Sequence, residues 1–295
     1  GMCYHSLKLK GKPEMKRVVR AVFAAAEVAV GCGSAVGFGL SAYAALSAKS
    51  YITDGLIVQL DGEENVGYGQ PYDSAATKWT DLTGNGSSVT LAGGAAFSSD
   101  CYGLGVQRKN CYMSIPNTTK LFAAYEAASY TFEFAYDKTV ATTVNAEGYA
   151  NLRCVFLMCG HNNYKFGTWA DNNIGACPNG TSSANFYGKT KSVTTTVGQH
   201  TYSVTQDGLA GNLYFDDLAA TAYTVTALTE APSTAHGAHF NYDYYGTSGL
   251  DGYYHSVRLY DRPLTADEIA VNRAVDKVRY FGVDAATLTL PTGWR

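Results

Sequence analysis

From residue 51 onward the chain repeats one pattern, a short apolar or alternating run followed by a turn signal. Glycine-containing turns fall at residues 84–86, 93–94, 178–180 and 207–208. Short strands separated by turns at this spacing favour an antiparallel sandwich of two sheets. Strands are expected at 56–60, 89–91, 111–115, 130–136, 152–159, 186–187, 200–205, 212–215, 222–225 and 252–260.

The composition agrees with an all-β domain. The 295 residues include 31 Gly and 23 Tyr, and only 16% of them are charged. Tyrosine suits a half-buried pleated surface, and glycine allows tight turns. No repeat of 20 to 50 residues is visible, which argues against solenoids and propellers.

One helix is expected near the end of the chain, from residue 266 to about 280. Thr265 is a suitable N-cap and Glu268 completes a capping box. Leu264 and Ile269 form the hydrophobic pair that often fixes the entry of the chain into a helix, and Gly282 follows the last turn. We expect the apolar side of this helix to pack on the sandwich.

The first 50 residues are typical of an export leader. Met15, Lys16 and Arg17 give a basic start, an apolar stretch follows, and small residues at 42–44 or 46–48 mark a cleavage point. One alternative is that these residues form a membrane anchor, and another is that they are neither an export leader nor an anchor. Ala-Val-Gly-Cys at 29–32 resembles, faintly, a lipoprotein signal.

This gives three expected segments. Residues 1–50 are upstream material plus a signal peptide or membrane anchor, 51–282 are the jelly-roll domain, and 283–295 begin a following segment. The leader predicts a secreted or cell-surface location, with membrane contact only through the leader itself.

Charge excludes one class of partner. The first 50 residues hold seven of the 22 Lys and Arg and two of the 25 Asp and Glu, so the remainder carries 15 basic and 23 acidic residues. An acidic body repels phosphate backbones, and no basic stripe interrupts it. Nucleic acid is therefore not an expected partner.

Three segments carry a family resemblance. Residues 250–265 (LDGYYHSVRLYDRPLT) resemble the closing strand and turn of laminin-G-like domains, of the concanavalin A-like lectin/glucanase superfamily, in bacterial secreted and surface proteins. The turn at 79–86 (WTDLTGNG) and the strand at 130–134 (YTFEF) agree with it, and the loop at 61–65 is similar to variants in large secreted proteins. The resemblance covers about 51–282 and implies a two-sheet antiparallel jelly roll with a short C-terminal helix. It implies much less about function, because this fold hosts lectins, adhesins and glycosidases.

The sequence lacks the common catalytic patterns. A glycosidase on this fold needs two carboxylates facing each other across a cleft, usually from one strand. Glu133 is alone on its predicted strand, and we expect it at an edge or facing outward. The sequence also lacks a Gly-x-Ser-x-Gly elbow, a His-Glu-x-x-His pair and a phosphate-binding Gly-Lys-Ser/Thr loop. The prediction is that the protein is not an enzyme.

Three predicted loops carry the mixture that sugar recognition uses, an aromatic platform beside carboxylates and amides. They are residues 68–73, 164–173 and 241–245. The alternative is that these aromatic rings simply cover the sheets. The candidate ligand-binding residues are Trp169, Tyr164, Asp171, Asn173, Tyr72 and Asp243.

The resemblance also implies that the domain could bind calcium, because carboxylates and carbonyls on sandwich loops suit the oxygen coordination of this ion. Asp61, Glu64 and Asp81 lie nearest the matching motifs. The alternative is that these side chains stabilise turns by hydrogen bonds.

Together these features predict a non-catalytic carbohydrate-binding or adhesion module of a larger exported surface protein. Its partners would be a glycan, or a cell-surface or matrix protein, and other domains of the same polypeptide. The alternatives are a structural spacer or a glycan-active hydrolase whose carboxylates come from separate strands.

Overall fold

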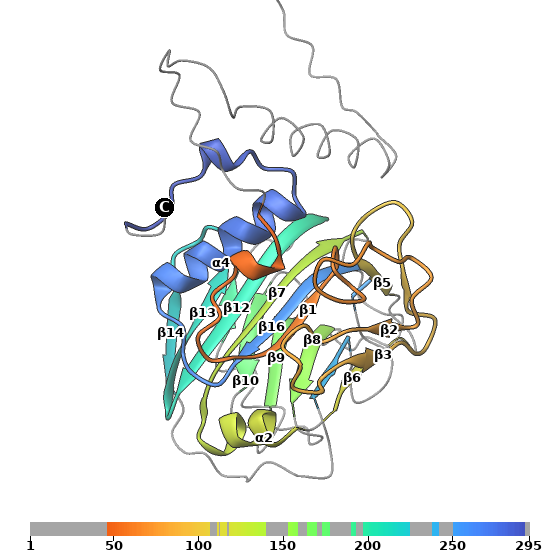
Figure 1. Cartoon of the computed structure of the whole chain (residues 1–295). Coiled ribbons are helices and arrows are strands. Elements are labelled where there is room, and N and C mark those ends of the chain that lie inside the picture. Colours follow the sequence, from red (N-terminus) through yellow and green to blue (C-terminus); the bar gives the residue numbers. More distant parts are fainter. Residues whose placement is uncertain are drawn as a thin grey trace, which may run out of the picture. The chain divides into compact units, whose positions relative to one another are not determined.

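The computed structural model describes residues 46–106, 111, 113–116, 118–139, 153–158, 164–169, 173–177, 190–192, 197–224, 238–241 and 250–292. Of these, residues 153–158, 164–169, 173–177, 190–192 and 238 are described by their backbone alone. The chain divides into two units, of which the first is Gly1–Ala45 with Ser99–Cys101. The second, Leu46–Ser98 with Tyr102–Arg295, carries all strands and helices that the structure describes (Figure 1).

The larger sheet is antiparallel, and β16 is its organising strand. One edge of β16 pairs along its length with β7, while the other edge is shared by β5 and β1. Within the described residues the order is β14-β13-β12-β7-β16-β5-β4, with β1 beside β16. The strands are β1 (Leu56–Asp61), β4 (Ala96–Phe97), β5 (Leu104–Val106), β7 (Ser129–Lys138), β12 (Gly198–Asp207), β13 (Ala210–Phe215), β14 (Thr221–Thr224) and β16 (Gly252–Tyr260).

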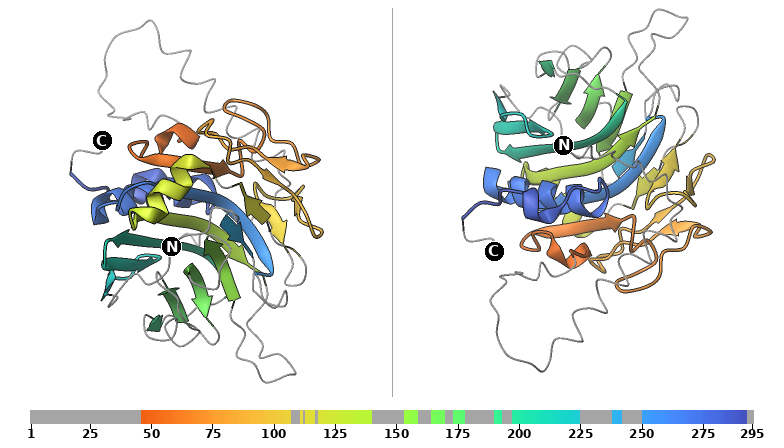
Figure 2. Two further views of the ribbon diagram at one scale, coloured as in Figure 1. Left: turned by 90° about the horizontal axis from the view of Figure 1, so that it is seen from below. Right: turned by 90° about the horizontal axis from the view of Figure 1, so that it is seen from above.

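A second antiparallel sheet lies against the first. Its order among the described residues is β11-β10-β9-β8-β15-β6, and a short pair, β2 with β3, stands apart. Figure 2 shows the layers from two directions. These strands are β2 (Lys78–Trp79), β3 (Val89–Thr90), β6 (Met113–Ile115), β8 (Arg153–Met158), β9 (Tyr164–Trp169), β10 (Asn173–Cys177), β11 (Thr190–Ser192) and β15 (Ala238–Phe240).

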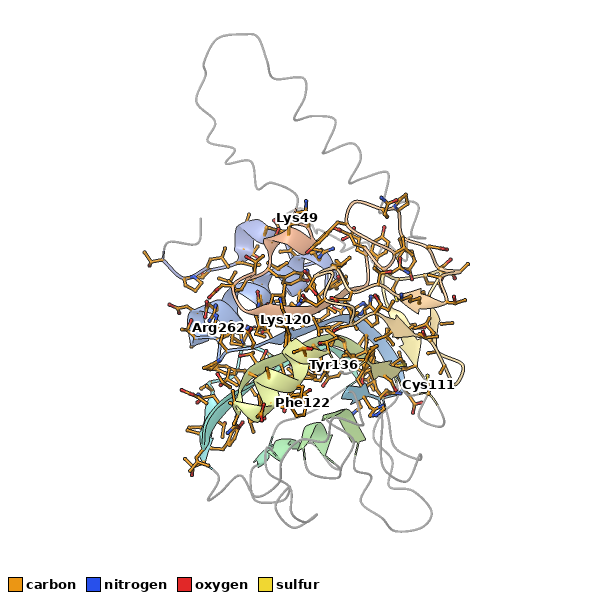
Figure 3. All side chains as sticks on the ribbon, turned by 60° about the horizontal axis from the view of Figure 1, so that its bottom comes forward. Lys49, Cys111, Lys120, Phe122, Tyr136 and Arg262 are labelled. Atoms are coloured by element: carbon orange, nitrogen blue, oxygen red, sulfur yellow. The ribbon has the colours of Figure 1, made fainter. Side chains whose placement is uncertain are left out.

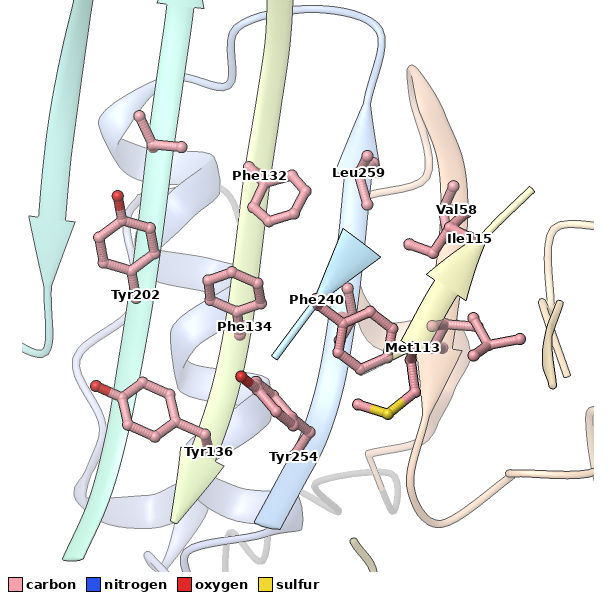
Figure 4. Packing of buried hydrophobic residues seen from close by; sticks show 14 of the residues in the cluster. Val58, Met113, Ile115, Phe132, Phe134, Tyr136, Tyr202, Phe240, Tyr254 and Leu259 are labelled. Carbon is pink, nitrogen blue, oxygen red and sulfur yellow. The ribbon is translucent and has the colours of Figure 1, made fainter. Parts of the chain in front are cut away.

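The main core lies between the two sheets and is rich in aromatic rings. Phe132 and Phe134 project from one face of β7, with ring centroids 4.9 Å apart, and Phe134 stacks on Tyr202 at 5.6 Å (Figure 4). From the second sheet Phe240 meets Tyr254 edge to face at 5.4 Å. Successive side chains of a strand alternate between faces, so the residues between these aromatics point to the other side of the sheet.

That other side is covered by helix α4 (Ala266–Arg279). Its N-terminus matches the prediction, because Thr265 and Glu268 form the expected capping box. Leu264 and Ile269 are both buried in a small apolar cluster with Ile52 and Tyr260. The predicted apolar side is incomplete, since the helix also buries Asn272, Asp276 and Arg279.

The predicted all-β sandwich with a short C-terminal helix is confirmed. Most predicted strands are present with shifted ends, and the one at 186–187 lies outside the described residues. Helix α2 (Thr119–Glu126) was not expected, although Thr118 caps it by accepting a hydrogen bond from the Leu121 N–H. In the described part of the chain, no helix is long and apolar enough to cross a membrane.

Candidate functional site

The loop at residues 68–73 is the only one of the three predicted binding loops whose residues are all described. Asn65 is fully buried and closes the loop, because its side chain donates to the Asp73 carbonyl (2.7 Å) and accepts from the Asp73 N–H (3.1 Å). Gly67 and Gly69 have positive φ angles of 146° and 67°, which favour glycine. The loop therefore has a fixed base.

Tyr68 presents its ring at the surface of this loop. It is 37% exposed, and its hydroxyl donates to Gln59 Oε1 at 2.7 Å. Lys49, which Figure 3 labels, places its ammonium 5.3 Å from the ring centroid of Tyr68, a cation–π contact. Partial burial and then the Glu64 carboxylate raise the pKa of the Tyr68 hydroxyl, so it stays a neutral donor. The result is an exposed aromatic ring held at its hydroxyl end, with a cation beside it.

Tyr72 has a packing role instead. Its hydroxyl donates to the Ser98 carbonyl at 2.7 Å. Its ring meets Phe97 and Tyr102 edge to face, with centroids 6.1 and 5.1 Å apart. The half-buried side chain therefore ties the loop to the core, while Tyr68 faces solvent.

The three predicted calcium ligands accept hydrogen bonds from the protein. Both oxygens of Asp61 pair with Arg279, and Oδ1 also accepts from the N–H groups of Glu63 and Glu64, each at 3.0 Å. Asp81 accepts from the N–H groups of Gln59, Thr83 and Ser87, each at 3.1 Å. These contacts correspond to the turn-stabilising alternative.

Glu64 joins two segments. Its Oε2 accepts from the Gly69 N–H at 3.1 Å, and its Oε1 accepts from the Ala48 N–H at 3.3 Å. Among the residues that the structure describes, no group of three or more His, Cys, Asp or Glu is arranged to hold a metal ion. Calcium binding stays a prediction.

The second predicted loop, 164–173, is largely a β-hairpin. Tyr164 begins β9 and Trp169 ends it, and Trp169 pairs with Asn173, the first residue of β10. At roughly 3.3 Å per residue, the backbones of Tyr164 and Trp169 are about 17 Å apart. Only Trp169 and Asn173 lie together at the turn, and Asp171 lies outside the described residues.

The third predicted loop starts at Asn241, which is buried and has a φ angle of 55°. Its side chain donates to the Cys111 carbonyl at 2.7 Å and accepts from the Leu250 N–H at 2.5 Å. Asn241 therefore joins the end of β15 to Cys111 and to Leu250. Asp243 lies outside the described residues.

Sequence reasoning missed a buried ionic network beneath α4. Glu133 was expected at an edge or facing outward, and this is wrong: it lies in the central strand β7 and is 1% exposed. Its carboxylate accepts from Arg258 Nε (3.1 Å), the Ser203 hydroxyl (3.0 Å) and Asn272 Nδ2 (2.6 Å). Burial raises its pKa, while Arg258 opposes the rise. The spacing of Asn272, Asp276 and Arg279 on one side of the helix was the available signal.

A carboxylate enclosed in this way holds the helix rather than facing a cleft. Glu133 and Asp276 share the Arg258 guanidinium, and all three side chains are 1% exposed. Two carboxylates that act on a glycan must reach it from a shared open site. The network is therefore a connection between α4 and the sheet.

Comparison with known proteins gives a likeness of fold. No family model matches the chain, and no curated protein matches it. It is similar to Trypanosoma rangeli sialidase in complex with the inhibitor DANA, with a TM-score of 0.54, 13% identity, and coverage of 89% of this chain and 38% of that one. The same enzyme in complex with sialic acid gives a TM-score of 0.54, 15% identity, and coverage of 92% and 40%.

A third solved structure is domain 4 of AbnA, a GH43 extracellular arabinanase from Geobacillus stearothermophilus, in complex with arabinotriose. It has a TM-score of 0.48 and 14% identity, and the match covers 74% of this chain and 96% of that one. The chain spans about two fifths of the length of the sialidases it resembles. At these identities the comparisons show a likeness of fold alone. The sheets place the chain in the class of all-β sandwich proteins.

Proposed function

We propose that this chain is a non-catalytic carbohydrate-binding module of a larger exported surface protein, of the laminin-G-like type. The observation that carries the proposal is the exposed Tyr68 ring, held by Gln59 and flanked by Lys49 on a loop closed by Asn65. Aromatic rings stack on the apolar faces of sugars, and neighbouring polar groups contact the hydroxyls. Trp169 is a second candidate, because its backbone pairs with that of Asn173 where β9 meets β10.

The choice of glycans to test follows from the comparisons. A protein of similar fold was solved with sialic acid bound. Lys49 supplies a positive charge next to Tyr68, which suits an acidic sugar. Sialylated glycans therefore belong in the first screen beside neutral ones.

The test is a glycan-array screen of the full chain, run with calcium and again with a chelator. We expect binding that Tyr68→Ala or Trp169→Ala reduces at least tenfold, while Tyr68→Phe retains most of it because the ring is kept. Leu209→Ala is the matched control, since this exposed side chain lies in the β12–β13 turn. Loss of binding with chelator would support calcium, and silence across the array would contradict the proposal.

A structural spacer is the second candidate. It is favoured by a specific observation: Tyr72, Asp61, Glu64 and Asp81 make internal hydrogen bonds that hold the domain together. A spacer predicts silence on the array and no effect of Tyr68→Ala. A hydrolase would instead need two solvent-facing carboxyls about 5 to 10 Å apart, and hydrolysis of an array glycan would reveal one.

A further inference from the structure

The turn that carries Lys49 has a fixed backbone. Ser47 caps the short 3-10 helix Ala48–Ser50 by accepting a hydrogen bond from the Lys49 N–H at 3.2 Å. The Ser47 N–H in turn donates to the Ser50 hydroxyl at 3.0 Å. The side chain of Lys49 is exposed, and the stem of a lysine is flexible. The ammonium can therefore move while the turn that carries it stays in place.

Gln59 links this turn to the Tyr68 ring. The residue is 1% exposed. Its Nε2 donates to the Ala48 carbonyl at 2.6 Å, and its Oε1 accepts from the Tyr68 hydroxyl at 2.7 Å. One buried amide therefore holds both segments, and breaking either hydrogen bond would leave a polar group unpaired away from water.

Glu64 makes a second link between the same two segments. Its Oε1 accepts from the Ala48 N–H at 3.3 Å, and its Oε2 accepts from the Gly69 N–H at 3.1 Å. An exposed cation–π contact is weak by itself. The two links, rather than the contact between Lys49 and Tyr68, keep the ammonium and the ring together.

The Lys49 ammonium lies over one face of the Tyr68 ring, 5.3 Å from its centroid. A sugar that stacks on this face must first displace the ammonium. A neutral sugar then loses the cation–π contact and gains no charge interaction in return, whereas an anionic sugar forms an ion pair with the displaced ammonium. The position of the cation therefore favours one class of sugar over the other.

The acidic side chains beneath the loop are engaged within the domain. Both oxygens of Asp61 pair with Arg279, and both oxygens of Glu64 accept backbone N–H groups. Asp61 is fully buried and the Glu64 side chain is 14% exposed, whereas Lys49 is exposed. An anion that approaches the ring from solvent therefore meets the charge of Lys49 before these carboxylates.

We propose that Lys49 is a latch on the Tyr68 ring, a side chain that covers the ring and moves aside for anionic sugars in preference to neutral ones. The ligand class is that of glycans with a carboxylate, such as a sialic or a uronic acid. The carboxylate binds the ammonium while the sugar ring takes its place on Tyr68. The inference rests on sugar binding at Tyr68 in the proposed function, and it adds the residue that sets the selectivity of that site.

The test is isothermal titration calorimetry of the full chain with sialyllactose, trigalacturonic acid and lactose. We expect at least one acidic probe to bind about tenfold or more tightly than lactose, and this preference to fall as salt is raised from about 50 to about 500 mM. The probe that binds tells a sialic acid from a uronic acid.

Three variants locate the preference. Lys49→Met should remove it, and it should raise the affinity for lactose by about two- to fivefold because the ring is uncovered. Lys49→Arg should keep it, since the charge is retained. Lys120→Met is the matched control, because it removes an exposed lysine on α2, and it should keep the preference as well.

The outcomes separate this inference from the proposed function. A parent that binds lactose as tightly as the acidic probes, or a Lys49→Met variant that keeps the preference or loses acidic and neutral binding equally, would overturn the latch and leave the binding module intact. The same follows if Tyr68→Ala changes no affinity, since the ligand then binds elsewhere. Absence of binding to all three probes overturns the latch, and silence of the glycan array as well overturns the proposed function.

Discussion

Arg258 on β16 and Asp276 on α4 form a two-point ion pair, with Nη1 2.9 Å from Oδ1 and Nη2 2.7 Å from Oδ2. Both side chains are 1% exposed. A bidentate pair constrains direction as well as distance, so it fixes how the helix is rotated against the sheet. Glu133 binds the same guanidinium from β7, which joins three elements at one cation.

Replacing Arg258 by methionine should destabilise the fold strongly. The change leaves the carboxylates of Glu133 and Asp276 buried without their cation, a loss of about 3 to 5 kcal/mol in the free energy of unfolding. Urea denaturation followed by circular dichroism measures it. The matched control is Arg262→Met, because Arg262 pairs with Glu268 in a partly exposed position and should cost only about 1 kcal/mol or less. Equal losses in the two variants would contradict this account.

Removing the hydroxyl of Tyr136 and removing that of Tyr260 should have different effects on the stability of the protein. Tyr136 is buried on β7, and its hydroxyl has no hydrogen-bond partner in the described part of the chain. The Tyr260 hydroxyl donates to the Ile52 carbonyl at 3.1 Å and accepts from Asn272 Nδ2 at 2.9 Å. Tyr136→Phe should therefore leave stability unchanged or raise it slightly, and Tyr260→Phe should lower it by about 1 to 2 kcal/mol.

Thermal and urea unfolding of the two phenylalanine variants make the measurement, since each loses one oxygen and keeps its ring. A Tyr136→Phe loss as large as that of Tyr260→Phe would show that the buried hydroxyl is bonded in solution.

Gly252 should be far less tolerant of alanine than Gly69. At Gly252, where φ is 159°, a Cβ would stand 1.9 Å from the Asp137 carbonyl oxygen of the neighbouring strand. The strands cannot part without breaking their pairing, so Gly252→Ala should cost at least about 3 kcal/mol. Gly69 has a φ of 67°, but no atom lies within 4 Å of where its Cβ would stand. Gly69→Ala should therefore lower the free energy of unfolding by only about 1 kcal/mol. Similar midpoints of denaturation for the two variants would refute the prediction.

Much of the fold could be predicted because its signals are local. Alternation and turn residues located most strands, and the capping box of Thr265 and Glu268 located the helix start. Seven of the strands that the structure describes were not expected. The short strands β2, β4, β5, β11 and β15 carry too little pattern, and β9 and β10 fall in or beside a segment expected as a binding loop. Helix α2 lies between two runs expected as strands, and the only local signal for its start is its N-cap, Thr118.

The site was harder to predict because its geometry depends on distant partners. Tyr68 and Tyr72 are alike in sequence. In the fold the Tyr68 hydroxyl bonds Gln59, whereas Tyr72 bonds Ser98 and packs on the rings of Phe97 and Tyr102. Glu133 looked isolated because Arg258 and Asn272 lie 125 and 139 residues away. Whether Trp169 binds a ligand stays a prediction.

The Glu268 carboxylate should give the protein a charge-dependent contribution to stability that disappears in strong acid. Arg262 Nη2 lies 2.6 Å from Oε1, and the Thr265 N–H donates to Oε2 at 2.8 Å. The hydrogen bond from Arg262, more than any other contact, lowers the Glu268 pKa to about 2 from its usual 4.5. Because the folded pKa lies below the unfolded one, the contribution is complete above about pH 5, and it is lost as the pH falls through 2.

Glu268→Gln tests this contribution, since glutamine keeps the capping geometry and loses only the charge. We expect the variant to be less stable by about 1 kcal/mol at pH 7, where the pair is partly exposed. The difference from the parent should shrink below pH 4, be small at pH 2 and vanish only below it, because a protonated Glu268 is no more charged than the amide. Unfolding followed at pH 7, 4 and 2 measures the difference, and a gap that persists unchanged at pH 2 would mean that the ion pair with Arg262 is not its source.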